Sequence, residues 1–142
     1  AGVTAGMHVR IASPEDYAPR ADVIEAADRR ARQTGGSITL FTDPVEAAAG
    51  ADVVVTDTWV SMGKEEEKLA RIRDLGGYKV TPETMELAHD DAIFIHCLPA
   101  DRGYEVDSAV IDGPQSVVWD EAENRLHAQK ALLVWLLGKK DA

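Results

Sequence analysis

The spacing of apolar residues along the chain predicts strands that alternate with helices. Apolar and polar residues alternate in Met7–Ala12, which is typical of a β-strand. Val53–Thr56 is a nearly continuous apolar run, of the kind that is buried on both faces of a parallel sheet. The same reading along the whole chain predicts five strands, at Met7–Ala12, Ile38–Phe41, Val53–Thr56, Ile93–His96 and Ser116–Trp119.

Capping signals and helical periodicity predict a helix in most of the intervals. Asp43-Pro44 and Thr81-Pro82 each join a capping side chain to a proline that suits a first helical turn. Gly35 suits the left-handed position that ends a helix. The predicted helices are Ala21–Thr34, Pro44–Ala49, Lys64–Asp74, Pro82–Ala88 and Glu121–Leu137.

This alternation predicts the α/β class, as a three-layer, open parallel sheet of Rossmann-like type. No linker or low-complexity segment divides residues 1–142, so we predict a single domain. Because the order of elements begins abruptly at Met7, we expect the sheet to lack an initial strand and helix.

Composition narrows the classes of partner. The chain has 142 residues, 25 acidic and 15 basic, with a formal net charge of −10. This charge argues against nucleic acid and anionic membranes as partners and favours a cationic substrate, although solubility alone also explains it. The longest apolar run, Ala131–Leu137, is too short to cross a bilayer. The single cysteine favours a reducing compartment, and we expect a cytoplasmic location.

The fourth predicted strand ends in His96-Cys97-Leu98-Pro99. In open parallel sheets, ligands bind beyond the carboxyl ends of the strands, so Cys97 stands where a substrate would lie. Cys97 is then either a reactive thiol, which needs an exposed and electropositive setting, or a small buried hydrophobic residue. Adjacent strand residues point to opposite faces, so His96 is expected to pack or hydrogen-bond inside the fold.

The third predicted strand ends in a polar loop, residues 57–63. Asp57 can bind a cationic amine, and the Ser61 hydroxyl with backbone N–H groups near Met62 can bind a carboxylate. Together these groups would clamp an amino acid. The alternative is that Asp57 or Ser61 only caps the helix that follows.

The first turn of the last predicted helix is acidic, which suits the helix dipole and needs no further function. Arg125 follows it and is either an exposed helix arginine or a ligand for phosphate or a polarised carbonyl. The four histidines show no metal-ligand spacing, and no glycine-rich phosphate motif is present, so we expect neither a metal nor a cofactor.

Three motifs together resemble ornithine carbamoyltransferase. They are Asp57-Thr58-Trp59-Val60-Ser61-Met62-Gly63, His96-Cys97-Leu98-Pro99 and Glu121-Ala122-Glu123-Asn124-Arg125, and the similarity to an actinobacterial branch continues to Lys130. The resemblance implies transfer of a carbamoyl group from carbamoyl phosphate to L-ornithine, which gives L-citrulline and phosphate.

The resemblance also implies a role for each matching residue. Asp57, Ser61 and Met62 would bind ornithine, and Leu98 would contribute its backbone carbonyl. Cys97 would act beside the reacting amine as a thiolate which, with Asp57, accepts its proton. Arg125 would contact carbamoyl phosphate and stabilise charge on its carbonyl oxygen.

The family's Ser-Thr-Arg-Thr-Arg phosphate loop has no counterpart here. The resemblance therefore implies an incomplete, carboxyl-terminal ornithine-binding domain, inactive alone, whose helix 121–137 reaches an absent carbamoyl phosphate-binding domain in a trimer-based homo-oligomer. One alternative is an amino-acid-binding module without catalysis. Another is a carbamoyltransferase for a different amine, such as putrescine, although a diamine has no carboxylate for Ser61-Met62-Gly63 to bind.

Overall fold

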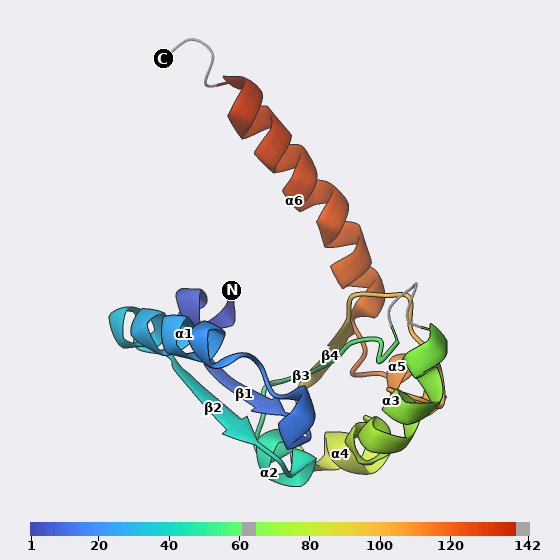
Figure 1. Ribbon diagram of the computed structural model, residues 1–142. Helices are drawn as coiled ribbons and strands as arrows, with labels where there is room; N and C mark the ends of the chain where they lie inside the picture. The colour runs from blue at the N-terminus through green and yellow to red at the C-terminus, as the bar shows by residue number, and fades with distance from the viewer. Residues whose placement is uncertain (61–64, 139–142) are drawn as a thin grey trace.

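The computed structural model describes residues 1–60 and 65–138 (Figure 1). Its strands are β1 (His8–Ala12), β2 (Ser37–Phe41), β3 (Val53–Thr56) and β4 (Ile93–His96). Its α-helices are α1 (Ala21–Thr34), α2 (Pro44–Ala48), α3 (Lys68–Leu75), α4 (Pro82–Leu87), α5 (Ser108–Ile111) and α6 (Val118–Gly138). Short 3-10 turns are η1 (Gly2–Ala5), η2 (Glu15–Tyr17), η3 (Glu65–Glu67) and η4 (Gly76–Tyr78).

The four strands form two parallel pairs. β1 pairs with β2, with His8 opposite Ser37, and β3 pairs with β4, with Thr56 opposite His96. The predicted α/β, Rossmann-like class with parallel strands is confirmed. The sheet differs from the prediction, because no backbone ladder joins β1 and β3 into one sheet.

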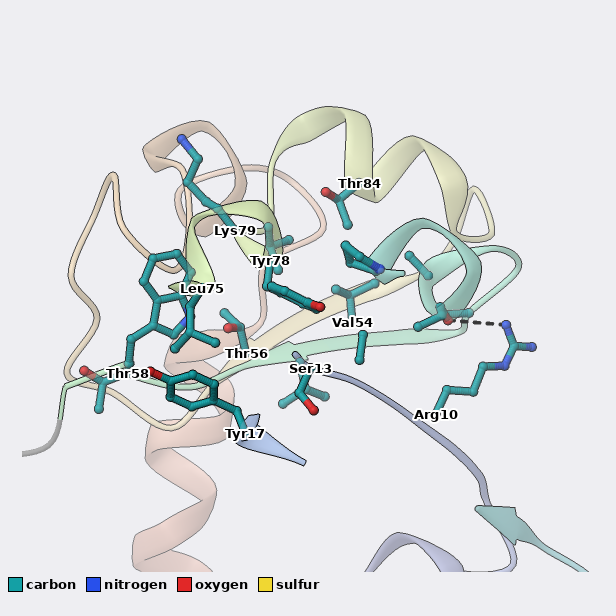
Figure 2. A pocket seen from close by; sticks show the side chains of 18 of the residues that line it. Arg10, Ser13, Tyr17, Val54, Thr56, Thr58, Leu75, Tyr78, Lys79 and Thr84 are labelled. Carbon is teal, nitrogen blue, oxygen red and sulfur yellow. Dashed lines mark hydrogen bonds between the residues drawn. The ribbon is translucent and has the colours of Figure 1, made fainter. Parts of the chain in front are cut away.

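A cavity of about 340 Å³ lies between the two pairs. Figure 2 shows Val54 and Thr56 of β3 in the middle of the lining, with Arg10, Ser13 and Tyr17 below them. Tyr17 and Tyr78 contribute polar groups to the walls. The cavity therefore lies between residues of β1 and β3 and extends to helices α2, α3 and α4.

Several helix ends lie where the local sequence signals predicted them. Gly35 ends α1 with a φ of 81°, and the Asp43 side chain accepts a hydrogen bond from the N–H of Val45 at the start of α2. Thr81 begins α4 in a capping box with Thr84. The start of the predicted helix Lys64–Asp74 lies outside the described residues, which show η3 followed by α3.

The predicted fifth strand, Ser116–Trp119, is wrong. Only one bridge forms, in which the Phe94 N–H donates to Gln115 O (2.8 Å) and the Val117 N–H donates to Phe94 O (3.0 Å). The next residue, Val118, is fully buried and already belongs to α6. Acidic residues in the first turn of α6 stabilise a helix at this point, so the chain turns before a strand can extend.

The main hydrophobic core lies entirely within residues 51–118. Its buried members are Val54, Val80, Met85, Ala88, Ala92, Phe94, Val106, Val110, Ile111 and Val118. Residues before 51 contribute only Val3, Ala31 and Ala48 to the buried hydrophobic residues of the described chain. Most of the apolar burial that stabilises the fold therefore belongs to β3, β4 and the helices around them.

The expectation that Val53–Thr56 is buried on both faces is wrong. Val54 is buried, but Val53 and Val55 are 40% and 61% exposed. Alternate residues of a strand point to opposite faces, so the core covers only one face of β3.

Helix α6 projects away from the rest of the molecule beyond its first turn (Figure 1). Its side chains from Ala122 to Gly138 are exposed, including a large apolar group: Leu126, Leu132, Leu133, Val134, Trp135, Leu136 and Leu137. Even so, none of the helices in the described residues is long and apolar enough to span a membrane.

Candidate functional site

The register of β3 and β4 brings two predicted site residues together. Thr56 and His96 are partners at the ends of these parallel strands, so Asp57 and Cys97 follow side by side. The Cys97 thiol donates a hydrogen bond to Asp57, with 3.1 Å between Sγ and Oδ1. The same Asp57 oxygen accepts the N–H of Thr58 at 2.7 Å, which fixes the carboxylate at the strand end.

The thiol of Cys97 stands in an electronegative setting. The hydrogen bond to Asp57 raises the pKa of Cys97, and partial burial and the charges of Asp57 and Glu121 raise it further. The side chain is exposed, as the reactive interpretation requires. The thiolate expected from the resemblance is not supported, because the two carboxylates disfavour a negative charge on the sulfur. In the hydrogen bond between them, the Cys97 thiol is the donor and Asp57 is the acceptor.

The turn after β4 is held by an internal hydrogen bond. The Leu98 N–H donates to Nδ1 of His96 (2.9 Å), while Leu98 has a φ of 52° and its side chain packs against the core. The Leu98–Pro99 peptide is cis. His96 is buried, as predicted, and Cys97 beside it faces solvent. The turn thus separates a structural histidine from an accessible thiol.

Glu121 is a neighbour of the site that the sequence analysis missed. Helix α6 packs against β4, and there the charge of Glu121 acts on Cys97. Its Oε2 atom is buried and has no hydrogen-bond partner in the described part of the chain. The helix dipole explained this acid fully from sequence, and only the packing of α6 on β4 distinguishes it from Asp120 and Glu123 beside it.

Arg125 lies one helical turn after Glu121 and therefore on the same side of α6. Its side chain is exposed and has no hydrogen bond or ion pair with any described residue. The structure thus leaves its guanidinium available to an anion. Two other predicted ligands of the amino acid, Ser61 and Met62, lie outside the described residues.

The cavity between the strand pairs is a different place from this group. None of Asp57, Cys97, Glu121 or Arg125 lines it. We assign the candidate site to the strand ends rather than to the cavity, because the thiol and the two carboxylates interact there and Arg125 lies on the same side of α6 as Glu121. Within residues 1–60 and 65–138, no three His, Cys, Asp or Glu side chains are grouped to hold a metal ion.

Comparison with known proteins agrees with this chemistry. Residues 1–136 match the family described as aspartate/ornithine carbamoyltransferase, Asp/Orn binding domain. The chain is 72% identical over 137 residues to an ornithine carbamoyltransferase of Clavibacter michiganensis subsp. michiganensis, covering 96% of this chain and 45% of that protein. The chain therefore spans less than half the length of that relative.

Solved structures show the same relationship. An ornithine carbamoyltransferase from Pyrococcus furiosus superposes with a TM-score of 0.88 at 48% identity, covering 93% of this chain and 42% of that one. An acetylornithine transcarbamylase complexed with acetylcitrulline gives a TM-score of 0.82 at 34% identity, covering 95% and 41%. By the match over residues 1–136, the chain belongs to the aspartate/ornithine carbamoyltransferase family and corresponds to its Asp/Orn binding domain.

Proposed function

We propose that this chain is the ornithine-binding part of an enzyme that transfers a carbamoyl group from carbamoyl phosphate to L-ornithine. The observation that supports this most directly is the pair formed by Cys97 and Asp57, with 3.1 Å between Sγ and Oδ1. Glu121 adds a second negative charge to the same place. A site of this sign suits the protonated side-chain amine of ornithine, which has to bind and then lose a proton before it can react.

The transfer itself needs a bond exchange and two proton transfers. The ammonium group of ornithine gives one proton to the Asp57 carboxylate, which the Cys97 thiol orients through its hydrogen bond. The free amine then attacks the carbonyl carbon of carbamoyl phosphate, and the bond from that carbon to the phosphate oxygen breaks. The nitrogen loses its second proton to the departing phosphate, so the products are L-citrulline, hydrogen phosphate and one proton.

The remaining predicted ligands complete this proposal. Ser61 and Met62 would bind the α-amino-acid end of ornithine, and the Leu98 carbonyl would accept a hydrogen bond from the reacting amine. Arg125, on the same side of α6 as Glu121, would bind carbamoyl phosphate and stabilise negative charge on its carbonyl oxygen. These roles are carried over from the resemblance, residue by residue.

We further propose that the domain is incomplete by itself. The exposed apolar surface of α6 would dock on a carbamoyl phosphate-binding domain, and a further parallel strand would fill the space between β1 and β3. The whole enzyme would be a trimer-based homo-oligomer in the cytoplasm. On this proposal the 142-residue chain alone has no measurable transferase activity, which an assay of citrulline formation tests; robust turnover would contradict it.

Kinetics of the whole enzyme test the site. Cys97→Ala is expected to lower kcat by about 10²-fold, because the Asp57 carboxylate that takes the proton loses the hydrogen bond that orients it. Asp57→Asn should raise KM for ornithine and also lower kcat. Asp91→Asn, an exposed acid before β4, is the matched control and should change neither constant. A kcat within about twofold of the parent for Cys97→Ala would reject its catalytic role.

A second candidate is transfer to another amine. The structural similarity to an acetylornithine transcarbamylase favours N-acetyl-L-ornithine as the alternative to test, since its reacting amine is also on the side chain. Steady-state rates with ornithine, N-acetylornithine and putrescine separate the two. A higher kcat/KM for N-acetylornithine would replace the proposal, and ornithine binding by the whole enzyme without turnover would favour the non-catalytic module.

A further inference from the structure

Two buried ionisable side chains lie directly beneath the Cys97 turn and have no place in the chemistry above. His96 and Glu105 are each 1% exposed. Glu105 follows the tight turn at residues 101–104, whose backbone is closed by hydrogen bonds from Gly103 to Val106 and from Tyr104 to Asp101. Carboxylates are rarely buried without a partner, because burial removes the water that solvates them.

The Glu105 carboxylate contacts both ends of segment 96–101, which contains Cys97. Its Oε1 accepts the backbone N–H of Asp101 at 2.5 Å and lies 3.5 Å from Nε2 of His96. On the other side of the ring, Nδ1 of His96 accepts the N–H of Leu98. Because Nδ1 is an acceptor, the neutral ring carries its proton on Nε2, which is the nitrogen nearer to Glu105.

These contacts hold a backbone conformation that L-residues rarely adopt. Leu98 has a φ of 52°, in the left-handed region, and its N–H is fixed by His96. Cys97 stands between these two residues, and its thiol reaches Asp57. The distance of 3.5 Å to Glu105 exceeds a normal hydrogen bond, and Nε2 has no hydrogen-bond partner among the described residues.

We propose that Glu105 and His96 are positioning residues, which act through Leu98 and Asp101 to hold the Cys97 thiol against Asp57. The positional part stands on the geometry of this chain alone, and only its consequence for catalysis rests on the proposed function. The nitrogen that carries the ring proton then lies 3.5 Å from Oε1 of Glu105. A merely structural role would instead require only that the two side chains fill and neutralise the space below the turn.

The alkylation rate of Cys97 in the full 142-residue chain tests the positional part, since Cys97 is the only cysteine. When the thiol loses Asp57, its thiolate fraction should rise, so Glu105→Ala should react with iodoacetamide about tenfold faster at neutral pH. Glu105→Gln has the same shape and an oxygen that still accepts the Asp101 N–H, so it should react nearly at the parent rate. Glu86→Gln, an exposed acid on α4, is the matched control.

A pair of histidine variants separates positioning from space filling. His96→Asn places an amide oxygen near the position of Nδ1 and can still accept the Leu98 N–H, whereas His96→Gln places its amide near Nε2 and cannot. We expect the asparagine variant to be alkylated at nearly the parent rate and the glutamine variant to be alkylated faster. Circular dichroism checks that both variants are folded. Equal rates for the two folded variants would overturn the proposal, and so would an unchanged rate in folded Glu105→Ala.

Kinetics of the whole enzyme then separate this proposal from the function. Glu105→Ala should lower kcat about tenfold, as a misplaced catalytic group does, with KM for carbamoyl phosphate unchanged. If alkylation responds and kcat does not, positioning stands and the catalytic role of Cys97 fails. If alkylation does not respond in any folded variant, positioning fails whatever the kinetics show.

Discussion

Neighbouring residues at the end of β4 have opposite environments, and the environment decides their chemistry. His96 faces the core and accepts a backbone hydrogen bond, while Cys97 faces solvent beside Asp57. A lone cysteine at a strand end predicts a place for a ligand, but not the protonation state of the sulfur. That state depends on Asp57, 40 positions earlier in the chain, and on Glu121, which reaches the site from α6.

Replacement of Asp57 tests this account of the thiol. We expect Asp57→Asn to lower the pKa of Cys97, because the carboxylate that raises this pKa by hydrogen bonding and charge is removed. The rate of alkylation as a function of pH should therefore have its midpoint at lower pH than in the parent chain. Asp91→Asn, at the opposite end of β4, should leave the midpoint in place. A midpoint that stays or moves upward would show that Asp57 does not control the thiol.

At the scale of elements, signals that act within a few residues predicted the ends of several helices but not every strand. The spacing and the terminating Gly35 predict α1 with its observed bounds, and the capping residues place the starts of α2 and α4. The residues at Ser116–Trp119 have the composition of a strand, but that prediction is wrong. Val118 is buried in the core and is already the first residue of helix α6. Whether such a segment extends or coils is decided by packing, which no local pattern contains.

Part of the candidate site could be predicted from local sequence patterns, and part depends on packing. Asp57 and Cys97 were predictable, because parallel strands end at one edge of a sheet. Glu105 and Glu121 were not, because each is an ordinary acid in sequence, and its importance comes from burial against β4 or the turn that follows it. When a residue reaches the site only because of how the chain folds, no periodicity or motif in the sequence identifies it.

The cap of α4 provides a test at this scale. Thr81→Ala removes the side chain that accepts the Thr84 N–H and breaks the capping box. Loss of an N-cap costs about 1 kcal/mol, so the free energy of unfolding in urea should fall by about that amount. Thr4→Ala, an exposed threonine in η1 without a side-chain hydrogen bond to any described residue, is the control. Equal effects of the two variants would mean that the cap contributes nothing to stability.

At the scale of the whole molecule, α6 is the feature that departs most from a globular protein. Its last turns are apolar on every side, and such helices are normally buried. Here Leu132, Leu133 and Leu137 are 53%, 60% and 65% exposed. Contiguous apolar surface of this kind marks an interaction site.

We therefore expect the isolated chain to self-associate and to bind a hydrophobic dye more than the whole enzyme does. The double variant Leu133→Gln and Leu137→Gln should weaken both effects, because it interrupts the apolar surface. Leu69→Gln, which replaces a single apolar residue 83% exposed on α3, should not. Sedimentation across a concentration series measures the association, and a monomer at high concentration without dye binding would rule the surface out.

The confinement of the core to residues 51–118 has a consequence for how the molecule opens. With little apolar surface buried before residue 51, the segment that carries β1, α1 and β2 should unfold locally at a lower free energy than β3 and β4. Native-state hydrogen exchange should therefore show amides of the β1–β2 ladder exchanging before those of the β3–β4 ladder, while equal protection would indicate a single cooperative unit. The molecule would then spend part of its time as a folded half that carries Asp57 and Cys97, joined to an open half that carries neither.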